Sequence, residues 1–163
     1  MNANKYRKLF KDIVLRFAQE SHCESKKVAV LAVRNGRIIA TGINGSPSGA
    51  KNCNDYFKEM YSTLNLKISY EDWKKTPEWR EIHHKWSESN EVHAEVSLLS
   101  EAAKNGITLN NIDIYISLEP CIHCVKLLIA LKPNNIFYVK EYDKGDPYSK
   151  ILLKNCGINI EKI

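Results

Sequence analysis

Residues 113–140 read DIYISLEPCIHCVKLLIALKPNNIFYVK, and the pattern of apolar and polar residues in this stretch indicates a strand, a helix and a second strand. We expect the strands at residues 113–117 and 135–140, with the helix at residues 120–131 between them. Pro120 suits the first turn of that helix, where its missing N–H is not needed for a hydrogen bond. The stretch therefore predicts the alternation of strand and helix that is typical of an α/β fold.

The residues on either side extend this pattern. Residues 27–34 and 37–41 are expected to form strands, and Asn35-Gly36 between them predicts a tight hairpin turn. The other elements that the pattern predicts are helices at residues 6–19, 91–104 and 148–155 and a last strand at residues 158–161. Together they predict a three-layer α/β/α sandwich, in which helices cover both faces of a mixed sheet of about five strands with an N-terminal hairpin.

The 163 residues fit a single domain. Two segments interrupt the pattern of strands and helices. A loop rich in Gly, Ser and Pro occupies residues 42–52, and a polar insertion that carries Trp and Tyr follows at about residues 55–89. We expect this insertion to be irregular or partly helical.

The net charge, the distribution of apolar residues and the cysteine count narrow the range of functions that we expect for the protein. The net charge of +5 is spread along the chain without a dense Lys/Arg block, which fits an anionic small molecule at least as well as nucleic acid. No long apolar run occurs and the start of the chain is polar, so we expect a cytoplasmic protein with no membrane partner. The five cysteines are assigned to metal binding or to the core rather than to disulfides, and Cys156 is expected in the core.

Two short motifs carry the chemistry. Cys121 and Cys124 stand at the start of an expected helix, where unpaired N–H groups and the helix dipole favour thiolates. Alone, this pair is equally typical of a redox motif, and an isolated His93-Ala94-Glu95 is more typical of a surface helix start than of a functional site. Together they indicate a zinc ion held by one histidine and two thiolates, with the fourth position open. His93 and Glu95 can share such a site only at a helix terminus, because residues two apart on a regular helix do not face one another.

The same motifs suggest how a reaction could proceed. Zinc lowers the pKa of a bound water toward neutrality, and Glu95, which is not a ligand, would carry protons from that water to a ring nitrogen and then to departing ammonia. His123 is expected at the surface, since a fourth protein ligand would leave no room for water. This combination is suited to hydrolysing an amine from a nucleobase ring.

These residues resemble the signature of the zinc-dependent cytidine deaminase superfamily. Further motifs resemble the deoxycytidylate (dCMP) deaminases, especially those encoded by bacteriophages: GINGSPSG at residues 42–49 with Asn52-Cys53, NEVHAE at residues 90–95 and EYDK at residues 141–144. The resemblance covers nearly the whole chain. It implies a cytidine-deaminase-like fold that converts dCMP to dUMP and ammonia, a reaction that feeds thymidylate synthesis. It also implies a homo-oligomer, commonly a hexamer, activated by dCTP and inhibited by dTTP, and is compatible with Mg²⁺ beside the nucleotide effector.

The resemblance also assigns roles to single residues. It implies substrate contacts for Asn44, Ser117 and Tyr142. The effector-binding residues that it implies are Gly42, Asn44, Gly45, Ser46, Pro47, Gly49 and Asn52, in a loop whose backbone N–H groups can line phosphates. Ile43, Ser48 and Ala29 depart from the family pattern, in which an aromatic residue, alanine and glycine are usual. These departures concern the effector loop and strand packing more than the zinc.

A second, structural zinc is also implied, at Cys23, Cys53 and His83. The alternative is that the two cysteines are ordinary buried thiols and that the histidine is solvated. The sequence identifies no fourth ligand for this site.

Other functions use some of the same residues. A polynucleotide deaminase of the tRNA adenosine type shares the ligand spacing, but it needs a basic groove and stacking aromatics. The aromatic residues of the insertion alternate with acids, so we expect no nucleic-acid partner. A free-nucleoside deaminase usually has cysteine in place of the histidine ligand, and a non-enzymatic zinc module would have no use for Glu95.

Overall fold

The computed structural model describes residues 3–143 and 145–163 and contains one mixed five-stranded sheet. Its strands are β1 (Ala29–Arg34), β2 (Arg37–Ile43), β3 (Asp113–Leu118), β4 (Asn135–Lys140) and β5 (Asn159–Lys162), in the spatial order β2-β1-β3-β4-β5. β1 is antiparallel to both of its neighbours, whereas β3, β4 and β5 are parallel. The expected mixed sheet and its N-terminal hairpin are confirmed, and Asn35 and Gly36 both take positive φ in the turn, at 53° and 74°.

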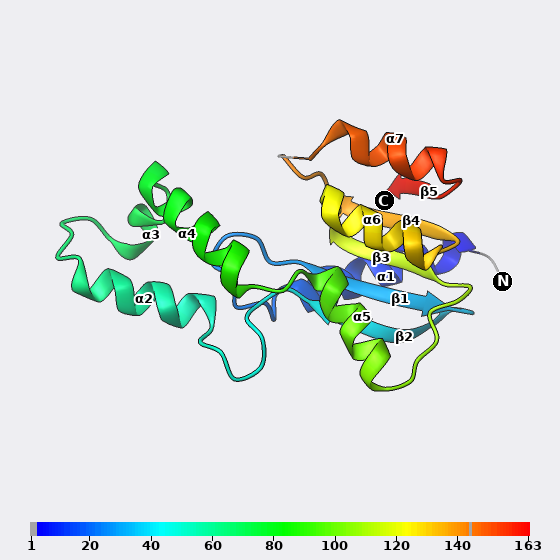
Figure 1. The fold of residues 1–163 in the computed structure, drawn as a ribbon, viewed down its shortest axis with the longest axis horizontal. Helices are drawn as coiled ribbons and strands as arrows, with labels where there is room; N and C mark the ends of the chain where they lie inside the picture. Colours follow the sequence, from blue (N-terminus) through cyan, green and yellow to red (C-terminus); the bar gives the residue numbers. More distant parts are fainter. Residues whose placement is uncertain (1–2, 144) are drawn as a thin grey trace.

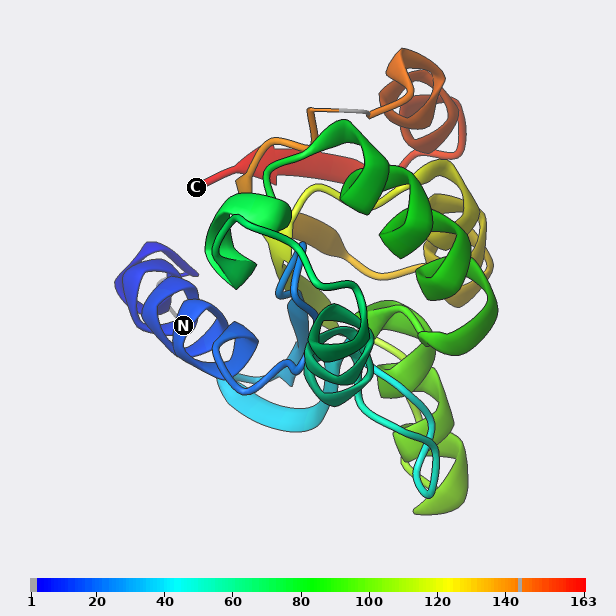
Figure 2. The ribbon, with the colours of Figure 1, turned by 90° about the vertical axis from the view of Figure 1, so that its left-hand side faces the viewer.

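Helices cover both faces of the sheet (Figures 1 and 2). α1 (Ala3–Ala18) packs on one face, and α5 (Ala94–Lys104), α6 (Ile122–Leu131) and α7 (Pro147–Asn155) pack on the other. The sheet has a hydrophobic core on each face, and alternate residues of a strand point into one or the other. Leu31 and Tyr115 face α1, whereas Val30 and Ile116 belong to the opposite core. The three-layer α/β/α sandwich is therefore the observed fold.

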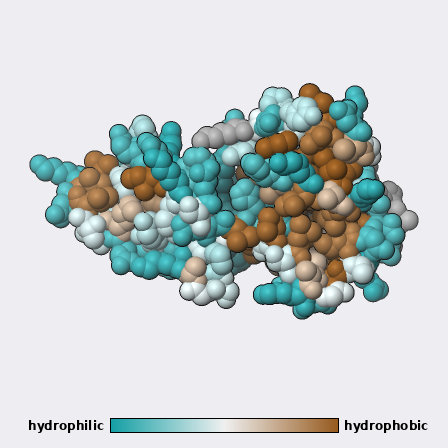
Figure 3. All heavy atoms as spheres, viewed as in Figure 1, coloured by the Kyte–Doolittle hydropathy of each residue, from teal (hydrophilic) through white to brown (hydrophobic). Residues whose placement is uncertain are grey.

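The insertion is helical rather than irregular. α2 (Cys53–Thr63), the short α3 (Tyr70–Trp73) and α4 (Pro77–Asn90) extend away from the sheet at the left of Figure 1. They share a core of their own, whose buried members are Cys23, Cys53, Phe57, Trp73 and Trp79. Figure 3 shows a largely hydrophilic face of this insertion, with apolar residues gathered toward its outer end. Its aromatic side chains thus pack mainly against one another, as in the Phe57 and Trp79 pair with ring centroids 5.5 Å apart.

Several loops meet at one edge of the sheet, where we locate the site. The start of β1 pairs with the end of β2, because Ala29 is the partner of Ile43, and Leu118 at the end of β3 pairs with Lys140 at the end of β4. The segments 21–28, 42–52, 119–121 and the residues after β4 therefore lie at the same edge. In open α/β sheets, ligands bind outside the carboxyl ends of the strands.

Three sequence-based boundaries or placements need correction. The helix expected at residues 91–104 begins at Ala94, because Val92 forms a backbone bridge to Gly45, which holds residues 91–93 extended. The helix expected from Pro120 begins at Ile122. Cys156, expected in the core, is exposed at the C-terminal end of α7.

Two further observations concern the extent of the described residues and the length of their helices. Lys144, the last residue of the EYDK motif, lies outside the described residues, as do Met1 and Asn2. Among the helices that the structure describes, none has the length and apolar character needed to cross a bilayer.

Candidate active site

Two helix starts bring His93, Cys121 and Cys124 together. His93 is the N-cap of α5 and Cys121 the N-cap of α6, both with extended backbone and with side chains that make no capping hydrogen bond. His93 Nδ1 lies 3.6 Å from Cys121 Sγ and 3.3 Å from Cys124 Sγ. The side chains that the sequence selected from two distant motifs thus converge at the ends of the strands.

These separations suit a tetrahedral zinc site. With zinc–nitrogen and zinc–sulfur bonds of normal length, two ligand atoms of a tetrahedron lie roughly 3.6 Å apart. The cluster offers three ligand atoms, all within 4.8 Å of one another, and no further His, Cys, Asp or Glu of the described residues joins them. His123 is exposed. The donor set therefore fits zinc with one position left for water or substrate.

The two cysteines share a proton. The Cys121 pKa is lowered, first because the Cys124 thiol donates a hydrogen bond to it and then because His93 does so, while the Cys124 pKa is raised as that donor. The N-terminal end of α6 adds a favourable dipole. Metal binding would take both sulfurs as thiolates and release the shared proton.

Glu95 is the acid beside this cluster. It lies in the first turn of α5, two residues after His93, and its side chain is only 5% exposed. Burial raises the pKa of Glu95, and the negative Cys121 raises it further. A carboxyl group whose pKa is raised toward neutral pH can both accept and donate a proton during a reaction.

Asn44 joins the loop after β2 to the segment before β1. Its Oδ1 accepts hydrogen bonds from Val28 N at 2.8 Å and from Ser21 Oγ at 2.7 Å, and its Nδ2 donates to the carbonyl of Lys26 at 2.8 Å. The bridge between Gly45 and Val92 places this loop directly beside the segment that carries His93. One N–H of the Asn44 amide is not used by these bonds.

Ser117 and Tyr142 occupy different positions at the same edge. Ser117 is buried, and its hydroxyl accepts a hydrogen bond from Ala29 N at 2.9 Å. Tyr142 is half-buried; its backbone N–H donates to Glu119 Oε2 at 3.3 Å. The pKa of Tyr142 is raised, first by burial and then by the negative charge of Cys121, so its hydroxyl is a donor close to the zinc ligands.

The loop at residues 42–52 packs against α5 through Gly42. A Cβ at this position would lie 2.1 Å from the carbonyl oxygen of Ala94 and 2.5 Å from Leu98 N, so only glycine permits the approach. Ser46 Oγ is buried and has no hydrogen-bond partner among the described residues. Pro47 and Gly49 are exposed, and Asn52 is the N-cap of α2.

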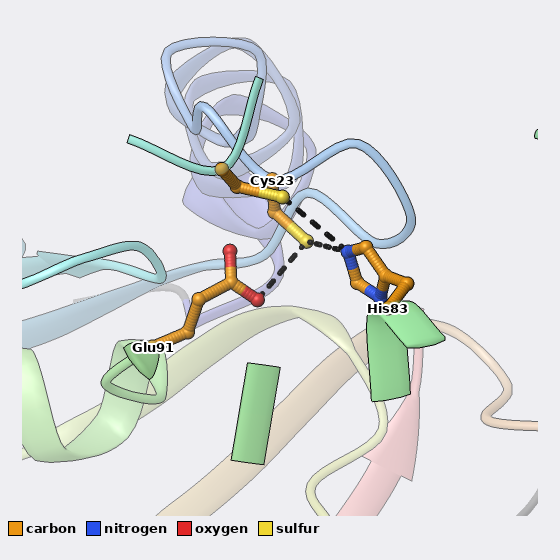
Figure 4. Close-up of side chains that lie close together, drawn as sticks. Cys23, His83 and Glu91 are labelled. Carbon is orange, nitrogen blue, oxygen red and sulfur yellow. Dashed lines mark hydrogen bonds between the residues drawn. The ribbon is translucent and has the colours of Figure 1, made fainter. Parts of the chain in front are cut away.

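A second cluster contains Cys23, Cys53, His83 and Glu91, with ligand atoms within 4.8 Å of one another. His83 Nε2 lies 3.7 Å from Cys23 Sγ and 3.4 Å from Cys53 Sγ, and Glu91 Oε2 lies 3.3 Å from Cys23 Sγ. Figure 4 shows the His83 ring and the Glu91 carboxylate turned toward the sulfur of Cys23. Four donors at these distances match a closed tetrahedral site.

Glu91 is the member that the sequence reasoning missed. Its Oε2 also accepts a hydrogen bond from Ser87 Oγ at 2.5 Å, while its Oε1 is buried without a partner among the described residues. An unpaired buried carboxylate oxygen is costly unless a cation joins it. The available signal was an acid in the NEVHAE motif, but no pattern in the sequence relates Glu91 to Cys23, Cys53 or His83.

Comparisons with known proteins agree with this geometry. The family model described as the cytidine and deoxycytidylate deaminase zinc-binding region matches residues 4–140. The deoxycytidylate deaminase of Enterobacteria phage T4 is 35% identical over 158 residues, which cover 88% of this chain and 82% of the relative. The dCMP deaminase of cyanophage S-TIM5, solved in complex with dCMP and dUMP, superposes with a TM-score of 0.72 at 25% identity and covers 100% of this chain and 99% of its own. A tRNA:A34 deaminase shares the fold, with a TM-score of 0.56 at 16% identity over 96% of this chain and 92% of its own.

Proposed function

The chain belongs to the cytidine and deoxycytidylate deaminase family, and from this premise we propose that it hydrolyses dCMP to dUMP and ammonia at a zinc ion held by His93, Cys121 and Cys124. The observation that carries the proposal is the convergence of these three side chains beside the buried Glu95. The dCMP and dUMP complex of the S-TIM5 relative supports the choice of substrate.

Each residue of the site has a separate role in the proposed reaction. His93, Cys121 and Cys124 would hold a zinc ion, which would supply a water molecule of lowered pKa, usable as a nucleophile at neutral pH. Glu95 takes one proton from the attacking water and passes it to the ring nitrogen beside the amino-bearing carbon; it then moves the remaining proton of the added hydroxyl to the amine, which departs as ammonia. The raised pKa of Glu95 suits it to both directions of transfer. Asn44 and Tyr142 hold the sugar and phosphate, and the buried Ser117 supports the floor of the substrate site.

Substrate competition tests this function. The zinc-loaded protein is given dCMP, deoxycytidine and a stem-loop RNA containing adenosine at the wobble position, and the deaminated product of each is measured by chromatography. The expected result is dUMP as the main product. Conversion of the RNA with no conversion of dCMP would replace the proposal with a polynucleotide deaminase.

The second cluster is proposed as a structural zinc site in which Glu91 is the fourth ligand of Cys23, Cys53 and His83. Four protein ligands leave no open position, so this ion would hold the insertion to the rest of the chain rather than act on substrate. The orphaned Glu91 Oε1 supports the assignment. Metal analysis should give two zinc ions per chain, and one ion or fewer in a folded sample would remove this site.

Regulation is proposed on the loop at residues 42–52. Gly42, Asn44, Gly45, Ser46, Pro47, Gly49 and Asn52 would bind dCTP as activator and dTTP as inhibitor, with Mg²⁺ on the phosphates, in a homo-oligomer such as a hexamer that works in the cytoplasm. The bridge from Gly45 to Val92 gives this loop a direct connection to His93. Rates on dCMP with each nucleotide, and sedimentation of the same samples, test the proposal. A rate that saturating dTTP leaves unchanged would contradict it.

A further inference from the structure

Lys26 contacts two parts of the site, the loop that carries Asn44 and the ring of Tyr142. Its backbone carbonyl accepts the hydrogen bond of Asn44 Nδ2 at 2.8 Å, which ties it to the loop beside His93. Its ammonium group lies 4.1 Å from the centroid of the Tyr142 ring, a residue whose surroundings include the charge of Cys121. A cation is thus held at the mouth of the zinc site, which we define as the space between Asn44 and Tyr142.

The ion pair of Lys26 is open to solvent. Lys26 pairs with Asp143, and their side chains are 38% and 73% exposed. Exposed ion pairs of this kind contribute little to stability, so a better anion can displace the carboxylate from the Lys26 ammonium at small cost.

We propose that Lys26 is the specificity-determining residue that selects a 5′-phosphorylated substrate over the free nucleoside, with Asp143 occupying its ammonium group until the phosphate replaces it. This inference rests on the proposed function. A nucleotide whose base reaches the zinc ligands carries its phosphate on the far side of the sugar, toward the mouth of the site. There the phosphate meets the Lys26 ammonium and the Tyr142 hydroxyl, which are both donors.

Two other lysines near this position, Lys27 and Lys150, have partners of their own. Lys27 directs its Nζ to the carbonyl of Gln19 at 3.2 Å. Lys150 pairs with Glu119 at 3.0 Å and lies 5.3 Å from the centroid of the Tyr138 ring. Among the described residues, Lys26 is therefore the lysine whose ammonium group lies over the Tyr142 ring, and its immediate neighbour Lys27 offers a matched control.

The test compares Lys26→Met with Lys27→Met on dCMP and on deoxycytidine. Loss of a charge-assisted phosphate contact should lower kcat/KM for dCMP by roughly 10- to 100-fold, mainly through KM, and leave deoxycytidine unchanged. Lys27→Met should stay within about twofold on both substrates. Lys26→Arg should recover most of the loss, because it restores a cation on the Tyr142 ring.

A second readout needs no turnover. The affinity for the product dUMP, measured by calorimetry, should fall in Lys26→Met, whereas Asp143→Asn should strengthen it by roughly two- to fivefold because a competing anion is removed. An unchanged ratio of dCMP to deoxycytidine kcat/KM in Lys26→Met, or weaker dUMP binding in Asp143→Asn, overturns the inference. A wild-type protein that converts no dCMP would refute the proposed function instead, and melting temperatures of all variants identify a folding defect.

Discussion

Glu91 and His93, which are separated by one residue, face two different clusters: Glu91 Oε2 lies 3.3 Å from Cys23 Sγ, and His93 Nδ1 lies 3.3 Å from Cys124 Sγ. Val92 between them is held by backbone hydrogen bonds of 2.8 and 3.1 Å to Gly45. Residues two apart in a regular extended segment would lie on the same side, so the division comes from where the two residues stand: Glu91 is the C-cap of α4, and His93 is the N-cap of α5. The second cluster can therefore position the segment from which His93 projects.

Cys53→Ser tests that connection. The variant should hold one zinc ion per chain instead of two, and the loss of roughly 2 kcal/mol or more should lower Tm by about 4–8 °C. We expect turnover of dCMP to fall with it, because Glu91 no longer anchors the His93 segment. Elemental analysis and calorimetry measure both effects. Cys156→Ser, at an exposed cysteine, is the control and should change neither.

Acidification should weaken the second cluster first through Glu91. Burial, followed by the charge of Cys23, raises the pKa of Glu91 to about 7, above its usual value of 4.5. In the metal-free chain this carboxyl binds a proton on folding, so its contribution to stability is present below about pH 4.5 and is lost as pH rises through 7. Zinc needs the carboxylate, so the increase in Tm on adding zinc should be larger at pH 8 than at pH 5. Glu91→Gln should reduce this difference, and a difference as large in Glu91→Gln as in the wild type would count against Glu91 as a ligand.

Glu95→Gln separates proton transfer from metal binding. The amide keeps the volume of the buried side chain but cannot carry a proton, so kcat on dCMP should fall by roughly 10²- to 10⁴-fold while zinc content is unchanged. Glu101→Gln, an exposed acid on the same helix, should retain the wild-type rate. A near-normal rate in Glu95→Gln would show that another group moves the proton.

Gly42→Ala should damage both stability and catalysis. The added methyl group meets backbone atoms of α5, which cannot move aside as a flexible side chain would, so the helix that carries Glu95 must shift. We expect a cost of roughly 1–3 kcal/mol and a lower kcat. Ser48→Ala, in an exposed part of the same loop, provides the comparison. Wild-type Tm and rate in Gly42→Ala would mean that the loop does not pack on α5 in solution.

Glu119 is expected to hold Tyr142 in place. Its buried carboxylate accepts the Tyr142 backbone N–H at 3.3 Å and pairs with Lys150 of α7 at 3.0 Å. Glu119→Ala should cost roughly 1–3 kcal/mol of stability and raise KM for dCMP more than it lowers kcat, because substrate contacts loosen while the zinc ligands stay. Lys140→Ala, an exposed residue nearby, should leave KM within about twofold. Equal loss in KM and kcat would point to a wider disturbance.

Strong local patterns made much of the fold predictable. β4 has the bounds expected from its apolar run, and the hairpin turn follows from Asn35-Gly36, whose residues accept positive φ. The His93 and Cys121 helix starts could be located because both motifs are short and carry side chains with few structural uses. The sequence pattern also indicated that His93 and Glu95 could meet only at a helix terminus.

The remaining features depend on contacts between distant segments. The start of α5 was placed three residues too early because the bridge from Val92 to Gly45 joins residues that no local pattern relates. The insertion lacks clear periodicity because part of its core is Cys23, which comes from the segment before β1. Glu91 could not be assigned to the second cluster until the directions of adjacent side chains were known. Cys156 is exposed because α7 ends there and turns its last residues to solvent.

The most direct test of the zinc site is the rate of dUMP formation measured against zinc content. Protein stripped by a chelator until no zinc is detected should form no dUMP from dCMP, and restoring zinc should recover the rate, because the attacking hydroxide depends on the ion beside His93, Cys121 and Cys124. Turnover by the zinc-free protein, or a zinc-loaded and folded protein that forms no dUMP, would contradict the account.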